Sequence, residues 1–195
     1  MKRKFKVDNE KNKVFGSQGF TILELLVVTA ILGILIGIAS SVFIGILRSQ
    51  NKTQVTNEAR QNAAIIIDLF ERDIRPALSI TPNGTNGITI KHRDEYVDWK
   101  CVGSTGSDNG RFTREIQLSG NLEVLTNTDS TSGVNIVCDN VNVAGANDVF
   151  TITGTVNQQQ IVLFAFTVAQ GIGAPTRNDY QINLPFETTV GTRVF

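Results

Sequence analysis

The stretch GFTILELLVV, residues 19–28, decides how the first third of this chain folds. It opens an apolar run from Phe20 to Leu47 in which Glu24 is the only charged residue. From residue 25 to residue 47 a helix would span roughly 35 Å, which is enough to cross a bilayer. An ionised carboxylate is costly in hydrocarbon unless it finds a partner, so Glu24 marks a candidate functional position.

The segment before the apolar run is basic. Residues 1–19 contain six lysine or arginine residues against two acidic ones, although the whole chain has a formal net charge of zero. The positive-inside rule predicts that this leader stays in the cytoplasm and that the C-terminal bulk lies outside. A secretory signal peptide fits poorly, because the run is about twice the usual ~7–15 residues and no small-residue cleavage site follows it. An ordinary signal anchor explains the leader and the length, but it does not explain Glu24.

Small residues recur at every fourth position of the run, so they share one face of a helix. These residues are Gly33, Gly37, Ser41 and Gly45. Spacing of this kind lets helix backbones approach closely in lipid. The pattern favours a span that packs against other helices.

The residues Gly19 to Val28 resemble the processing and methylation motif of type IV prepilins and type II secretion pseudopilins. The resemblance implies that a prepilin peptidase cuts after Gly19, removes residues 1–19 and methylates the new N-terminal Phe20. It also implies that Glu24 meets the N-terminal amine of a neighbouring subunit in a filament. Pairing of Glu24 with the amine of its own chain stays open, since the two are four residues apart. Many major pilins have a proline in the middle of the apolar segment, and none stands there in this chain.

A second, amphipathic helical segment is predicted over residues 48–79. Its apolar residues at helical spacing are Val55, Ala59, Ala63, Ile66, Ile67, Phe70 and Ile74. No turn signal separates Leu47 from Asn51, so we expect residues 20–47 and this segment to form one helix. Pro76 disfavours helix at Arg75 and is expected to end or kink it.

Residues 80–195 predict a β-rich head, because short runs of β-branched and aromatic residues alternate with Gly, Asn, Ser and Asp clusters. The candidate strands are residues 87–92, 95–102, 111–118, 121–126, 134–138, 148–154, 160–168, 180–184 and 188–194. The economical architecture is an antiparallel sheet laid on the helix. The expected class is therefore α+β, in the arrangement that the resemblance implies, the pilin fold.

Parts of the head resemble one branch of the family more weakly. LFERDIRPA at 69–77 is similar to the J-type minor pseudopilins and the W-type minor pilins, and so are Tyr96, GRFTRE at 110–115 and TTVGTRV at 188–194. This resemblance implies a low-copy subunit of a priming or tip complex.

Candidate ligand and disulfide residues are few. Cys101 and Cys138 lie on different candidate strands, and they could form a disulfide outside the cytoplasm or remain two buried thiols. His92 is the only histidine, so zinc is not expected. Asn127, Asp129 and Thr131 alternate like calcium-loop ligands, but Ser132 stands where that loop needs glycine. We expect no metal, no cofactor and no enzyme activity, since no catalytic motif is present.

The sequence therefore predicts a structural subunit, of the minor, priming or tip type, of a type IV pilus or related filament. A type II secretion minor pseudopilin is the first alternative. A tip adhesin or DNA-uptake binding subunit, and a membrane-anchored protein that never polymerises, are the others. The expected partners are other pilin or pseudopilin subunits, the prepilin peptidase, an inner-membrane assembly platform, and lipid before assembly. The chain after residue 19 is mildly acidic, so its charge gives no reason to expect general nucleic-acid binding.

Overall fold

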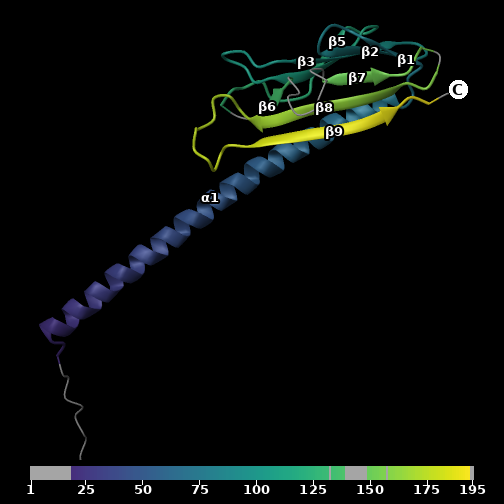
Figure 1. Ribbon diagram of the computed structural model, residues 1–195. Helices are drawn as coiled ribbons and strands as arrows, with labels where there is room; N and C mark the ends of the chain where they lie inside the picture. Colours follow the sequence, from purple (N-terminus) through teal and green to yellow (C-terminus); the bar gives the residue numbers. More distant parts are fainter. Residues whose placement is uncertain (1–18, 132, 139–148, 157, 194–195) are drawn as a thin grey trace, which may run out of the picture. The chain divides into compact units, whose positions relative to one another are not determined.

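The computed structural model describes residues 19–131, 133–138, 149–156 and 158–193. It divides into two compact units, one ending at Gly45 and one beginning at Ile46. Helix α1 spans Ile22–Ile74 (Figure 1). The strands are β1 (Ser79–Pro82), β2 (Gly87–Lys91), β3 (Tyr96–Val102), β4 (Arg111–Ile116), β5 (Asn121–Val124), β6 (Val134–Val137), β7 (Phe150–Thr153), β8 (Ile161–Gln170) and β9 (Asn183–Gly191). The chain has the α+β pilin architecture of one long N-terminal helix followed by antiparallel sheets.

Helix α1 is one continuous element of 53 residues, which confirms that the two predicted helical segments run on without a break. It ends at Ile74, as expected from Pro76, so residues 75–79 of the segment predicted over 48–79 lie outside the helix. Pro76 supplies no backbone N–H and disfavours helix before it. The N–H of Leu78 donates to the carbonyl of Lys91, so the chain has already turned into a sheet.

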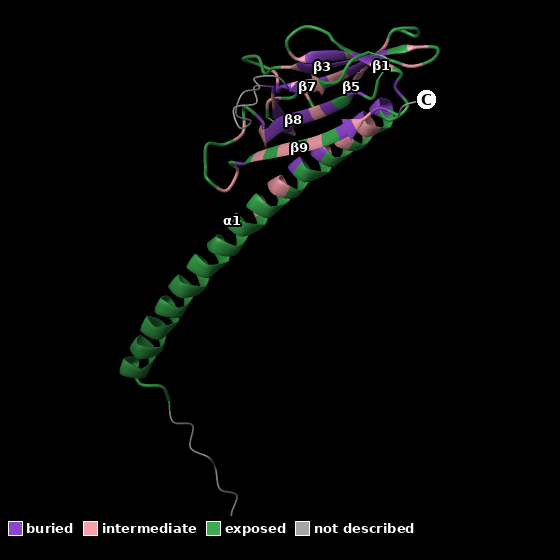
Figure 2. Ribbon diagram, turned by 45° about the vertical axis from the view of Figure 1, so that its right-hand side comes forward, coloured by how far each residue is buried: buried purple, intermediate pink, exposed green. Residues whose placement is uncertain are grey.

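The C-terminal part of α1 buries one face in the head. The fully buried residues of that face are Ala59, Ala63, Ile66, Phe70 and Ile74, as their helical spacing predicts. The helix from Ile22 to Gln50 has no buried residue and is exposed throughout (Figure 2). Burial in α1 thus begins only where the helix packs on the head.

The strands form two antiparallel sheets rather than the single sheet expected. The first has the order β1-β2-β3-β4-β5. In the second, β8 pairs with β6 and β7 along different halves and with β9 along nearly its whole length. β1 was not predicted, and the two strands expected at 180–184 and 188–194 are one, β9. Pro185 interrupts the sequence pattern there, but β9 is an edge strand, where a missing backbone donor is tolerated.

Aromatic side chains join the helix to both sheets. The ring of Phe70 on α1 lies 4.2 Å from that of Phe164 on β8 and 5.4 Å from that of Trp99 on β3, between ring centroids. Phe112 on β4 lies 5.3 Å from Phe164. All four side chains are fully buried. Each element therefore contributes a large apolar side chain to the same core.

A buried ion pair fastens the end of α1 to the first sheet. Asp73 accepts hydrogen bonds from Nε of Arg114 at 2.7 Å, from Nη2 of Arg114 at 3.2 Å and from Nε1 of Trp99 at 2.8 Å. Arg114 also donates to Glu123 at 3.1 Å. The hydrogen bonds to Asp73 and, to a smaller extent, to Glu123 hold the pKa of Arg114 above its usual value. Burial of the guanidinium lowers the pKa but does not outweigh them. The pair aligns α1 with β3 and β4.

The structure joins Cys101 and Cys138 by a disulfide across a sequence separation of 37. Because closing such a loop restricts the unfolded chain, replacing both cysteines by alanine should lower the free energy of unfolding by about 2–4 kcal/mol. Denaturant unfolding of the full chain in detergent, followed by the fluorescence of Trp99, would measure this. A change below ~0.5 kcal/mol would contradict the prediction, since surface substitutions alone reach that size.

Candidate functional site

The predicted cleavage position lies just before the helix. Gly19 and Phe20 belong to neither helix nor strand, and both are exposed, Phe20 by 79%. Thr21 caps the helix, because its Oγ1 accepts the backbone N–H of Glu24 at 3.2 Å and its carbonyl accepts that of Leu25 at 3.2 Å. The bond between Gly19 and Phe20 is therefore open to a peptidase.

Glu24 lies in the first turn of α1 and is exposed. A carboxylate there interacts favourably with the helix dipole, and Thr21 with Glu24 has the spacing of a capping box. Glu24 makes no ion pair with any residue that the structure describes. The geometry leaves its charge available to another molecule.

The small-residue face of α1 is open. A Cβ added at Gly33, Gly37 or Gly45 would meet no atom within 4 Å. Ser41 satisfies its own hydroxyl by donating to the carbonyl of Ile38 at 2.8 Å. The apolar side chains around them are also exposed. An exposed apolar face of this size needs lipid or other helices to cover it.

Within the residues described, one helix is long and apolar enough to cross a membrane, judged by length and composition. It is α1, and the qualifying window lies near the N-terminus with none of it buried. The N-terminal apolar helix fits a membrane-anchored pilin.

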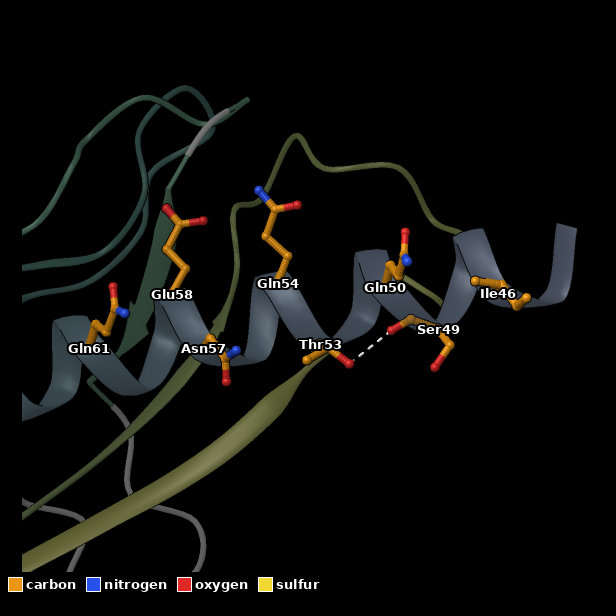
Figure 3. Close-up of a pocket in the computed structure, with 8 residues that line it drawn as sticks. All are labelled: Ile46, Ser49, Gln50, Thr53, Gln54, Asn57, Glu58 and Gln61. Atoms are coloured by element: carbon orange, nitrogen blue, oxygen red, sulfur yellow. Dashed lines mark hydrogen bonds between the residues drawn. The ribbon is translucent and has the colours of Figure 1, made fainter. Parts of the chain in front are cut away.

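A second exposed surface follows along α1, and we name it the polar stripe. It lines a groove of about 690 Å³ and consists of Ile46, Ser49, Gln50, Thr53, Gln54, Asn57, Glu58 and Gln61. Figure 3 shows Gln50, Gln54 and Glu58 projecting from one side of the helix. Thr53 donates to the carbonyl of Ser49 at 2.9 Å. Because all its members come from α1 alone, the groove is an uncovered helix surface and not an enclosed pocket.

Comparison with known proteins identifies the N-terminus. Residues 15–40 match the family model described as the prokaryotic N-terminal methylation motif. The chain carries the N-terminal methylation motif, and this motif supports the type IV prepilin and pseudopilin family. The match includes Gly19, Phe20, Glu24, Gly33 and Gly37 and stops before the head. No curated protein and no solved structure matches the chain significantly.

The remaining candidate ligands take part in local turns. Within the described ranges, no group of three or more histidine, cysteine or acidic side chains could hold a metal ion. Asn127 and Asp129 make hydrogen bonds within local turns. Asn127 Oδ1 accepts a hydrogen bond from the N–H of Asp129 at 2.9 Å. Asp129 Oδ1 accepts hydrogen bonds from the N–H and from the hydroxyl of Thr131. The backbone N–H of His92 donates to the carbonyl of Glu95 at 2.9 Å in a turn. A pilin-type motif points to a structural subunit and not to an enzyme.

Sequence reasoning missed two functional features. The cap at Thr21 had a local signal, T-x-x-E at residues 21–24. The pairing of Asp73 with Arg114 had only a partial signal in the sequence. This signal is the acidic Asp73, which directly precedes Ile74 on the buried face of the helix. Neither residue type nor spacing could identify its partner 41 positions away.

Proposed function

We propose that this chain is a subunit of a type IV pilus or related filament, matured by a prepilin peptidase. The enzyme cuts between Gly19 and Phe20 on the cytoplasmic side and methylates Phe20. The head lies outside the cytoplasm, and the subunit then leaves the membrane for the filament. The observation that carries the proposal is the match of residues 15–40 to the methylation motif, on a cleavage position that is exposed and not helical.

Assembly proceeds through α1. Glu24 pairs with the N-terminal amine of an adjacent subunit, because each group is costly alone in an apolar surrounding and each can neutralise the other. The open face at Gly33, Gly37, Ser41 and Gly45 packs against neighbouring helices. The polar stripe then meets neighbouring subunits further along the helix. A separate motor supplies the energy for assembly.

Within the family, we favour a minor subunit that primes assembly or occupies the tip. The supporting observation lies in the segment LFERDIRPA, which resembles the J-type and W-type branch. Phe70 from this segment lies in the aromatic core, and Asp73 makes the buried ion pair with Arg114. The branch resemblance therefore rests on residues that position the head on its helix.

Intact mass spectrometry of the membrane-extracted protein tests maturation. With a co-expressed prepilin peptidase, the mass should fall by residues 1–19 and rise by one methyl group. A Gly19→Leu variant should stay uncut, because a side chain then stands at the scissile bond, while Gly16→Leu is the matched control and should be cut. An uncut wild-type chain in the presence of active peptidase would leave a plain signal anchor.

A further inference from the structure

A cationic cavity lies in the unit that begins at Ile46, where the loop between β8 and β9 meets α1. The helix contributes Arg48, Ser49 and Lys52, and the loop contributes residues 176–179. Its volume is about 580 Å³. Two segments separated by more than a hundred residues thus line one open space, whereas the polar stripe comes from α1 alone.

Specific contacts hold the loop on the helix. The hydroxyl of Tyr180 accepts a hydrogen bond from Nδ2 of Asn51 at 3.3 Å. The guanidinium of Arg177 lies over the ring of Tyr180, 5.7 Å from its centroid, and pairs with Asp179 at 2.9 Å. These contacts keep the cation of the loop next to the cations of the helix.

The charge of the cavity is unbalanced. The lining contains three cations, Arg48, Lys52 and Arg177, and a single carboxylate, that of Asp179, which pairs with Arg177. Arg48 and Lys52 are four residues apart, so they share one side of α1. Within the part of the chain that the structure describes, neither makes an ion pair. Like charges repel at this spacing, so an anionic occupant would stabilise the arrangement.

The position of the cavity along the chain favours an occupant at the membrane surface. Arg48 is the first charged residue after the apolar run that ends at Leu47. With that run in a bilayer, Arg48 and Lys52 lie at the level of the lipid headgroups. Cations on the side away from the cytoplasm run against the positive-inside bias, so their presence there needs a reason.

We propose that this cavity binds the phosphate headgroup of an anionic phospholipid and seats the head on the membrane surface before assembly. The inference rests on the proposed membrane anchoring of residues 20–47. The guanidinium of Arg48 can bind phosphate through paired hydrogen bonds, and Lys52 adds a point charge. Arg177 adds positive charge beside them, while Asp179 holds its own paired N–H groups. Tyr180 is of the residue type that is enriched at membrane interfaces.

Amide hydrogen exchange of the full chain in lipid nanodiscs tests the proposal. One set of discs contains only zwitterionic lipid, and the other contains added phosphatidylglycerol. Each cation near an anionic surface contributes roughly fivefold in affinity, so loop residues 171–182 should exchange at least about fivefold more slowly in the anionic discs. Added salt should reduce the difference.

Charge-matched variants separate the site from general attraction. The triple change Arg48→Gln, Lys52→Gln and Arg177→Gln should abolish the lipid-dependent protection. The control triple, which changes exposed cations elsewhere, is Arg60→Gln, Arg93→Gln and Lys100→Gln, and it should keep the protection. Unchanged Trp99 fluorescence would verify that each variant folds. If the triple variant of the cavity does not fold, Arg177→Gln alone takes its place.

Three outcomes would overturn the proposal. Equal exchange in both kinds of disc would show that the loop does not sense anionic lipid. Equal loss in both triples would assign the effect to overall surface charge. Equal protection by inorganic phosphate in zwitterionic discs would make the cavity a site for free phosphate. Failure of the peptidase to cut the chain would leave all these readouts intact, so the two proposals fail separately.

Discussion

Replacing Glu24 by glutamine should stop the cleaved subunit from entering filaments. Removing one member of a buried charge pair costs about 3–5 kcal/mol, which corresponds to a loss of roughly 100-fold or more in incorporation. Membrane insertion and cleavage should continue, because neither depends on this charge. The measurement is the fraction of cleaved protein recovered in sheared filaments, relative to that left in the membrane, in a cell with the assembly machinery.

Glutamine is the informative substitution at this position. The backbone N–H of Glu24 donates to Thr21 Oγ1, and a capping box accepts glutamine as well as glutamate at its fourth residue. Capping therefore accounts for a polar side chain but not for a charge. If Glu24→Gln assembled normally, capping would be the whole role of the residue and the pairing with an incoming amine would be wrong.

Asp68→Asn is the matched control. It removes a carboxylate charge from an exposed position on the same helix, outside the polar stripe. Exposed charges contribute little, so incorporation should change by no more than a few fold. Equal loss in both variants would mean that assembly responds to the overall charge of α1 and not to the charge at Glu24.

Local patterns in the sequence predicted what depends on neighbours in the chain. The 3.6-residue spacing from Ala59 to Ile74 identified the buried face of α1, and the run from Gly19 to Glu24 identified the candidate site. Most strands were found from alternation bounded by turn residues. These features need only a few consecutive residues to be specified.

Features that depend on distant partners could not be predicted. β1 has only four residues, and it becomes a strand by pairing with β2. β9 continues through Pro185 because β8 lies on one side of it. The loop around Tyr180 reaches Asn51 across 129 positions, and no local signal records that contact. The cationic cavity could therefore be recognised only in the folded chain.

Breaking the pair between Asp73 and Arg114 should have the largest effect on stability. The side chains are only 7% and 11% exposed, and the carboxylate also accepts the indole N–H of Trp99. Asp73→Asn and Arg114→Met should each lower the free energy of unfolding by about 3–5 kcal/mol, because each leaves a buried charge without its buried partner. In Asp73→Asn, Arg114 keeps only the more exposed Glu123 as an ionic partner. Denaturant unfolding in detergent, read by Trp99 fluorescence, would measure this.

Two further variants make the prediction specific to burial. Glu71→Gln breaks the exposed pair with Arg75, whose side chain is 60% exposed, and should cost no more than about 1 kcal/mol. The double change Asp73→Leu with Arg114→Met should be less destabilising than either single change, because it removes both buried charges together. Additive losses in the double variant would contradict a buried, coupled pair.

The stability that the charge of Arg114 contributes to this pair should not change with pH near neutrality. Its hydrogen bond to Asp73 raises the pKa of Arg114 in the folded chain. Stability from a raised pKa is fully present below the pKa of the unfolded chain and is lost only as the pH rises through the folded value. Both lie far above neutrality for arginine. The cost of Arg114→Met should therefore be the same at pH values of about 7 and about 9, and a marked fall across that range would assign the effect to another group.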